Sequence, residues 1–203
     1  MNTISNDIQK PSWFLNLTEG FRSFIDWVGC LFFMFFHTYK NIGNAQPIMV
    51  VPGFLGTDAA TYFLRRFLRK SGYTVYGWEL GRNLGNIEDL KTLAKKIQTI
   101  SEKHHQKVVL IGWSLGGVYA RELAKILPDK VRSVITLGTP FSGSPKSTNA
   151  WRVYEITSGR RSEHDSSHYD LPTAPPVPTT SVFSRTDGIV AWQASIQAPC
   201  AVN

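Results

Sequence analysis

The chain has 203 residues, of which 42% are hydrophobic, 12% aromatic and 18% charged, so it can bury a core and is not a disordered chain. Its 22 Lys and Arg against 15 Asp and Glu give a net charge of +7. Two groups of these cations, at residues 65–70 and 91–103, fall on the solvated faces of two expected helices, which argues against a nucleic-acid partner and leaves anionic lipid as an alternative. Cys30 and Cys200 form no disulfide framework or metal-ligand spacing, so we expect neither a metal nor a cofactor.

The first expected element is an amphipathic, aromatic helix at residues 20–36. Its last two turns are apolar on all sides and need cover from protein or lipid. The helix would span about 25 Å, less than the roughly 30 Å core of a bilayer, and Arg22 and Asp26 lie inside it. The segment fits neither a transmembrane span nor a signal peptide, so we expect a helix that packs on the domain or contacts a membrane peripherally, in a protein of the cytoplasm or the membrane surface.

From residue 46 onward, short β-branched apolar runs alternate with longer helical patterns. Strands are expected at residues 48–51, 74–78, 108–112 and 131–137, with helices at 59–70, 87–103 and 115–127 between them. This rhythm is typical of an α/β fold with a doubly wound, mostly parallel sheet. The strand that ends at Gly112 should be central, between those that end at Pro52 and Gly138, and a later strand at 180–184 should form an edge.

The alternation stops after Phe141. Residues 141–178 are rich in Ser, Pro, Thr, Arg and His, and so long an irregular insertion is typical of a lid or a binding loop. We therefore expect an N-terminal helical segment at residues 1–45 and one α/β domain at residues 46–203 that contains the insertion.

Residues 112–117, Gly-Trp-Ser-Leu-Gly-Gly, join an expected strand to an expected helix and match the pattern G-x-S-x-G. A serine nucleophile must project from a tight turn between these elements, and the flanking positions need glycine because the backbone passes too close for a β-carbon. Ser114 is therefore the candidate nucleophile. The backbone N–H groups of Leu115 and of Phe54, in the loop after the first strand, are candidate oxyanion-hole donors.

These motifs resemble those of α/β-hydrolases of the lipase and esterase kind, with some likeness to lipase-like proteins related to inositol deacylases. The resemblance covers residues 46–192 and rests on segments 51–56, 112–117, 138–143 and 184–188. It implies hydrolysis of carboxylic esters with apolar acyl groups, an ester or lipid-like substrate, and Asp187 as the acid of a catalytic triad. The last strand and helix of such a fold are not found in the sequence.

The resemblance fails at the catalytic histidine, which in this family follows the acid. All five histidines precede Asp187, so impaired hydrolysis is expected. His164 and His168, in the insertion, are the candidate bases. Two alternatives stay open, a non-catalytic protein that binds lipid or a partner, and an acyltransferase that uses the same serine.

Overall fold

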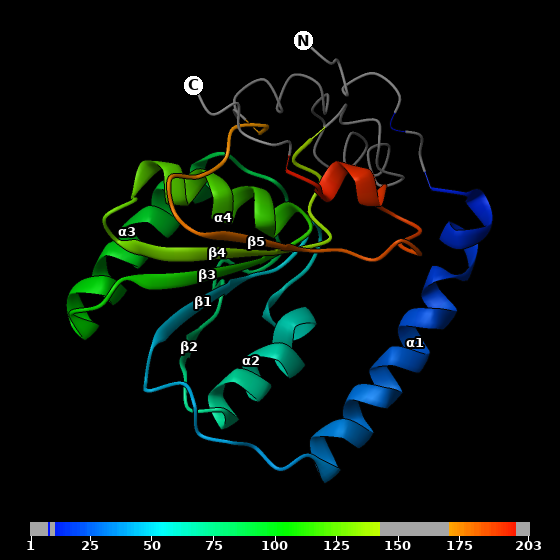
Figure 1. The fold of residues 1–203 in the computed structure, drawn as a ribbon, viewed down its shortest axis with the longest axis horizontal. Helices are drawn as coiled ribbons and strands as arrows, with labels where there is room; N and C mark the ends of the chain where they lie inside the picture. Colours follow the sequence, from blue (N-terminus) through cyan, green and yellow to red (C-terminus); the bar gives the residue numbers. More distant parts are fainter. Residues whose placement is uncertain (1–7, 9–10, 143–170, 198–203) are drawn as a thin grey trace.

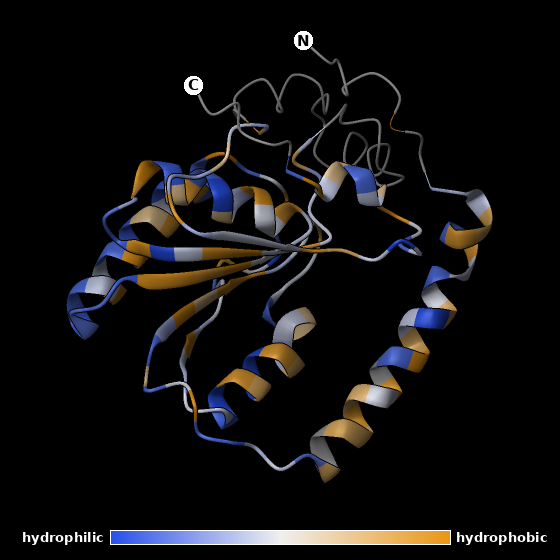
Figure 2. Cartoon of the chain, viewed as in Figure 1, coloured by the Kyte–Doolittle hydropathy of each residue, from blue (hydrophilic) through white to orange (hydrophobic). Residues whose placement is uncertain are grey.

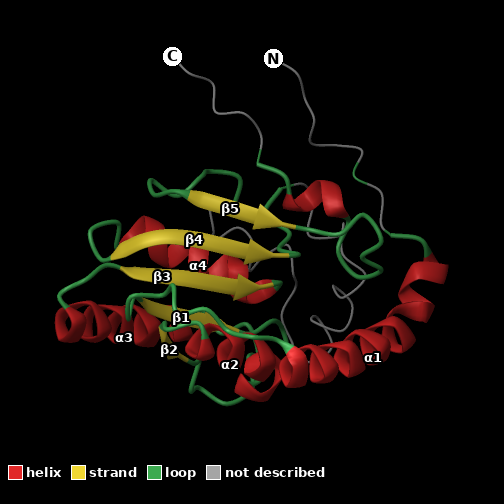
Figure 3. Cartoon of the chain, turned by 60° about the horizontal axis from the view of Figure 1, so that its bottom comes forward, coloured by secondary structure: helices red, strands yellow, loops and turns green. Residues whose placement is uncertain are grey.

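The computed structural model describes residues 8, 11–142 and 171–197 (Figure 1). One sheet has the order β2-β1-β3-β4-β5, and every neighbouring pair of its strands is parallel, as the common direction of the arrows in Figure 3 shows. The strands are β1 (Pro47–Val51), β2 (Thr74–Tyr76), β3 (Val108–Trp113), β4 (Val131–Leu137) and β5 (Thr179–Val182). The helices are α1 (Trp13–Phe36), α2 (Tyr62–Lys70), α3 (Glu88–His104) and α4 (Leu115–Ile126), with short 3-10 helices η1 (Asp58–Thr61) and η3 (Trp192–Ser195).

The doubly wound α/β fold expected from the sequence is confirmed. β3 lies at the centre between β1 and β4, and β5 forms an edge. Observed strand ends differ from the expected ends by at most two residues. The expected helix at residues 59–70 is a 3-10 turn followed by α2, because Thr57 caps the turn by accepting the N–H of Ala59 at 3.3 Å.

Alternate residues of the central strands serve two separate apolar layers. Met49 and Val51 of β1 pack with buried residues of α3 and α4, whereas Ile48 and Val50 face the other side, toward α2. Parallel strands that are buried on both faces need apolar residues throughout, which explains the continuous apolar run of β1. Figure 2 shows these apolar strands at the centre of the molecule.

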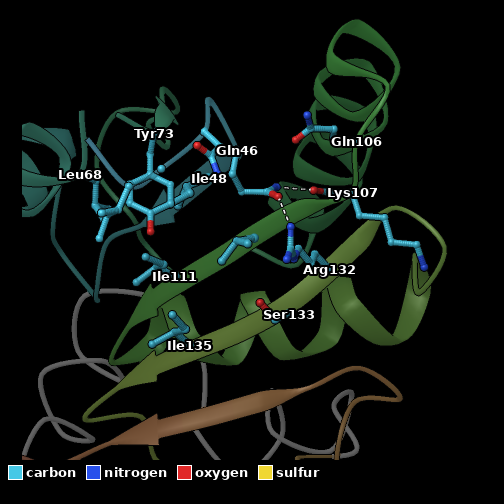
Figure 4. Close-up of a pocket in the computed structure, with 14 residues that line it drawn as sticks. Gln46, Ile48, Leu68, Tyr73, Gln106, Lys107, Ile111, Arg132, Ser133 and Ile135 are labelled. Carbon is cyan, nitrogen blue, oxygen red and sulfur yellow. Dashed lines mark hydrogen bonds between the residues drawn. The ribbon is translucent and has the colours of Figure 1, made fainter. Parts of the chain in front are cut away.

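The sheet face that carries α2 also contains a hollow of about 770 Å³ (Figure 4). Ile48, Ile111 and Ile135 line it, together with the Tyr73 ring. At its rim, Gln46 accepts a hydrogen bond from Arg132 and donates one to the carbonyl oxygen of Lys107 at 2.7 Å, at the amino ends of β1, β3 and β4. Ser114 follows the opposite, carboxyl end of β3, so this hollow is not part of the candidate catalytic site.

Arg121 of α4 anchors the chain that returns after the insertion. The Arg121 side chain is fully buried and donates to the carbonyl oxygens of Leu171 and Thr173 at 3.1 Å and to Gln197 Oε1 at 2.8 Å. Its guanidinium lies 3.9 Å from the centre of the Phe141 ring. Burial lowers the pKa of Arg121 to about 10. The helix that begins at the candidate nucleophile thus holds both ends of the irregular segment.

Helix α1 begins at Trp13 rather than at residue 20, so the expected start was wrong. Ser12 caps the helix by accepting the N–H of Phe14 at 3.3 Å, a local signal that the apolar periodicity did not include. The helix contacts the loop after β5 near its amino end and α2 near its carboxyl end, where the rings of Phe33 and Phe67 lie 6.0 Å apart. Within the described part of the chain, no helix is long and apolar enough to cross a membrane.

Candidate active site

Ser114 occupies a strained turn between β3 and α4. Its backbone angles are φ 52° and ψ −121°, a conformation that costs a non-glycine residue about 1–3 kcal/mol. Two hydrogen bonds hold the turn. The N–H of Ser114 donates to the carbonyl oxygen of Leu137 at 2.8 Å, and the Thr139 hydroxyl donates to the carbonyl oxygen of Ser114 at 3.0 Å. The next strand thus supports the conformation that projects the serine.

The glycines on both sides of Ser114 are required by close backbone contacts. A β-carbon at Gly112 would overlap the carbonyl group of Gly116, and one at Gly116 would overlap the carbonyl oxygen of Val51. The turn therefore packs directly on the carboxyl end of β1 as well as on that of β4. This arrangement gives the sequence pattern G-x-S-x-G its physical basis.

The loop at residues 52–56 lies against Ser114. A β-carbon built on Gly53 would be 3.2 Å from the β-carbon of Ser114, so the loop that carries the Phe54 amide borders the candidate nucleophile. Leu115, the other candidate donor, is the first residue of α4, where helical N–H groups lack partners within the helix. The structure therefore places Leu115, and the loop that contains Phe54, beside the turn at Ser114.

Asn83 holds this loop in place, a role that the sequence reasoning missed. Its side chain is fully buried and donates to the carbonyl oxygen of Pro52 at 2.8 Å, and the backbone carbonyl of Asn83 accepts the N–H of Leu55 at 2.7 Å. Leu55 has a positive φ of 60°, which these contacts stabilise. The sequence indicated only that residues 81–85 form a turn, and a turn-rich composition does not show which segment Asn83 contacts.

Asp187 follows β5 and its carboxylate lies beside the end of β4. One oxygen, Oδ1, accepts the N–H groups of Ile189 and Val190 at 2.8 and 2.9 Å. A β-carbon built on Gly138 would lie 3.2 Å from the other oxygen, Oδ2. Because Gly138 directly precedes Thr139, whose hydroxyl bonds to Ser114, residues 138–139 lie between the candidate nucleophile and the candidate acid. Ser114 and Asp187 thus share the carboxyl edge of the sheet.

Helix α1 contacts the backbone on both sides of Asp187. The Asn16 amide donates to the carbonyl oxygen of Gly188 at 3.2 Å, and the N–H of Gly188 donates to Glu19 Oε2 at 3.2 Å. Arg22 forms an ion pair with Glu19 at 2.9 Å and donates to the carbonyl oxygen of Thr186. These partners are more than 160 residues apart in sequence, so no local pattern could have indicated the contact.

A polar hollow of about 370 Å³ lies between α1 and residues 184–188, the loop that carries Asp187 and is called the acid loop below. It is lined by the following residues of the helix and the loop: Glu19, Arg22, Ile25, Asp26, Ser184, Thr186 and Asp187.

None of the three described histidines is paired with Ser114. His37 stacks on Phe33 with ring centres 4.3 Å apart, His104 Nε2 lies 2.7 Å from the Tyr76 hydroxyl, and His105 ends α3 in a left-handed conformation. In the part of the chain that the structure describes, no histidine is hydrogen-bonded to Ser114, and no three His, Cys, Asp or Glu side chains are grouped so as to hold a metal ion. His164 and His168 lie outside the described residues.

A parallel sheet of this order, with a strained serine between its central strand and the following helix, defines the α/β-hydrolase fold. The family described as PGAP1-like alpha/beta domain matches residues 75–193, more than half of the chain, and the chain belongs to this family. Together with the similar proteins described next, the match places the chain in the lipase- and esterase-like superfamily of α/β-hydrolases.

Known lipases resemble the chain in sequence and in fold. A triacylglycerol lipase of Pseudarthrobacter phenanthrenivorans is 35% identical over an alignment of 111 residues. The match covers 48% of this chain and 34% of the lipase, so the chain spans about a third of that relative's length. The fold is similar to that of Aspergillus fumigatus lipase B, with a TM-score of 0.60 and 18% identity over 80% of this chain and 44% of the lipase. Mature Bacillus licheniformis lipase BlEst2 has a TM-score of 0.55 and 20% identity over 82% of this chain and 85% of the lipase.

Proposed function

We propose that this protein is a serine-nucleophile hydrolase of carboxylic esters with apolar acyl groups, in which Ser114 attacks the ester. The observation that carries the proposal is the backbone of Ser114, whose strained conformation is maintained by contacts with three strands. Strain of this kind persists only where surrounding structure enforces it, and it occurs preferentially at functional sites.

In the proposed reaction, Ser114 Oγ forms a bond to the ester carbonyl carbon while its proton passes to a base. The carbonyl oxygen then carries negative charge, which the N–H groups of Phe54 and Leu115 would stabilise, at about 3–4 kcal/mol for a well-placed donor. Collapse of this intermediate expels the alcohol and leaves an acyl-serine, which water hydrolyses. Asp187 would orient the base, and its two backbone hydrogen bonds keep its carboxylate in one direction.

The base is the incomplete part of this site. His164 and His168 of the insertion are the candidates for it, since none of the described histidines is hydrogen-bonded to Ser114. Without a base the serine hydroxyl stays protonated, and only the rate supplied by the oxyanion donors and by binding remains, about 10³ to 10⁴ over water. The proposal therefore includes impaired hydrolysis.

The proposed substrate class is an ester or a lipid-like molecule. It rests on the relative named a triacylglycerol lipase, to which 48% of this chain is similar. Peripheral contact of residues 20–36 with a lipid surface is proposed separately, because Phe21, Phe24 and other aromatic residues of this segment are exposed.

A non-catalytic protein that binds lipid or a partner is the second candidate function. The described histidines favour it, because none is hydrogen-bonded to Ser114. An acyltransferase would use the same acyl-serine and differ only in the acceptor that replaces water.

Labelling with a fluorophosphonate probe tests the proposed nucleophile. The wild-type chain should become labelled at Ser114, and the Ser114→Ala variant should not. A matched control is Ser133→Ala, a half-buried serine in regular strand β4. Labelling that persists in Ser114→Ala would place the nucleophile elsewhere, and a labelled wild type without ester turnover would favour the acyltransferase or the binding protein.

A further inference from the structure

Helix α1 exposes a continuous apolar stripe along its full length. Its most exposed rings are Trp13, Phe21 and Phe36, at 75, 70 and 81%. The other exposed members of the stripe are Phe14, Leu17, Phe24, Ile25 and Phe32. At 3.6 residues per turn these positions project within an arc of about 140°. No charged residue belongs to this apolar stripe.

Within the described part of the chain, the apolar stripe faces away from the α/β domain except at Ile25, which lines the edge of the polar hollow beside Asp187. The hydrogen bonds of α1 to the loop that carries Asp187 come from Asn16, Glu19 and Arg22, which all project outside the arc of the stripe. The backbone carbonyl of Leu15 also approaches Gly188. Figure 2 shows the apolar carboxyl-terminal turns of α1 beside α2, at the border of the molecule. A soluble surface rarely carries so long an apolar patch unless another surface covers it.

Unpaired cations flank the carboxyl-terminal end of the stripe. Phe33 of α1 packs on Phe67 of α2, which brings α2 and its exposed residues Arg66 and Lys70 next to the last turns of α1. Lys40 follows α1 and is also exposed. In the described part of the chain, none of these three cations forms an ion pair. An aromatic stripe bordered by free cations matches a bilayer surface, with an apolar interior below anionic headgroups.

We propose that α1 docks this protein on an anionic lipid surface, with the apolar stripe in the outer acyl region and Lys40, Arg66 and Lys70 on the headgroups. A second copy of the chain is a poorer occupant, because each copy carries a net charge of +7 and the same unpaired cations beside the stripe. The opposite side of α1 contacts the backbone on both sides of Asp187, so docking brings this loop to about one helix diameter, roughly 10 Å, from the lipid surface. The lipid substrate in this picture rests on the proposed function, whereas the docking surface itself does not.

Co-sedimentation with phosphatidylcholine vesicles, with and without phosphatidylserine, tests the docking surface. The wild-type chain should bind better when phosphatidylserine is present. The double variant Phe21→Ser, Phe32→Ser should lose about tenfold or more in affinity for both vesicle types, since it removes two rings from the stripe. The double variant Arg66→Glu, Lys70→Glu should lose the preference for phosphatidylserine. Its affinity for vesicles that contain phosphatidylserine should fall at least about fivefold for each cation removed.

Two control variants isolate the contribution of the apolar stripe to vesicle binding. Ile126→Ser changes an exposed apolar residue of α4, 57% accessible, and should bind as the wild type does. Ser114→Ala should also bind unchanged, so failure of the proposed catalysis leaves the docking result readable. Equal binding by the wild type and the Phe21→Ser, Phe32→Ser variant would overturn the inference. Absence of vesicle binding by the wild type would also overturn it. If light scattering then showed a dimer of the wild type that the Phe21→Ser, Phe32→Ser variant cannot form, the stripe would be an interface between two copies of the chain.

Discussion

The carboxylate of Glu19 accepts the backbone N–H of Gly188 at 3.2 Å, although 169 positions separate the two residues in sequence. Gly188 directly follows Asp187, so a helix outside the α/β sheet contacts the loop of the candidate acid. The contact leaves no room for a side chain at position 188, because a β-carbon there would overlap the carbonyl oxygen of Leu15. Helix α1 is therefore built into the candidate site rather than attached beside it.

Replacing Glu19 should alter the acid loop more than the overall stability. Glu19→Ala removes the Gly188 hydrogen bond and the ion pair with Arg22, both partly exposed, at a cost of about 0.5–1.5 kcal/mol in the free energy of unfolding. We expect a several-fold decrease in fluorophosphonate labelling rate. Glu88→Ala, which removes an exposed ion pair with Lys91 on α3, is the control and should leave labelling unchanged. Equal labelling in the Glu19→Ala variant and the wild type would show that α1 does not position the site.

The Ser114→Gly variant should be more stable than the Ser114→Ala variant. Both variants lose the hydroxyl, but only glycine adopts φ 52° without strain, so Ser114→Gly should unfold at a free energy about 1 kcal/mol higher than Ser114→Ala. Urea unfolding measures the difference. For Ser133 of β4, where the backbone is extended, the order should reverse, with glycine less stable than alanine. The same order at both positions would mean that the turn at Ser114 is not strained.

Asn83 should matter for both stability and reactivity. Asn83→Ala leaves the buried carbonyl oxygen of Pro52 and the N–H of Gly85 without their side-chain partner, which costs about 1–3 kcal/mol each when such groups stay dry. The loop that carries the Phe54 amide should loosen, so labelling of Ser114 should slow even at temperatures where the variant stays folded by circular dichroism. Asn41→Ala, at an exposed position, serves as the control. A folded Asn83→Ala variant with normal labelling would argue against this positioning role.

Ester turnover should be feeble in the wild-type chain. If His164 or His168 supplies the base, the variants His164→Ala and His168→Ala should reduce turnover of a short-chain nitrophenyl ester, and the double variant should match Ser114→Ala. His105→Asn, at a left-handed helix end that asparagine also tolerates, should have no effect. Ordinary turnover that survives both histidine substitutions would contradict the account of an impaired triad, unless a histidine of another subunit lies beside Ser114.

The sequence by itself determined the sheet and the turn at Ser114. Buried parallel strands need continuous apolar runs, and a serine on a tight strand-to-helix turn needs glycine at positions 112 and 116. Both features can therefore be predicted from short stretches of sequence. The central place of β3 and the edge place of β5 were also predicted, and the observed strand order confirms both. The likeness of motifs also located Asp187 at the carboxyl end of a late strand.

Only the tertiary structure decided how distant segments meet around that turn. Three side chains form hydrogen bonds with the backbone of distant residues: Asn83 with Pro52, Thr139 with Ser114, and Glu19 with Gly188. The partners in these pairs have no fixed spacing in sequence. The direction of the α1 stripe was undecided for the same reason, because periodicity defines an apolar face but not what covers it. The contacts of Glu19 and Arg22 turn that face outward.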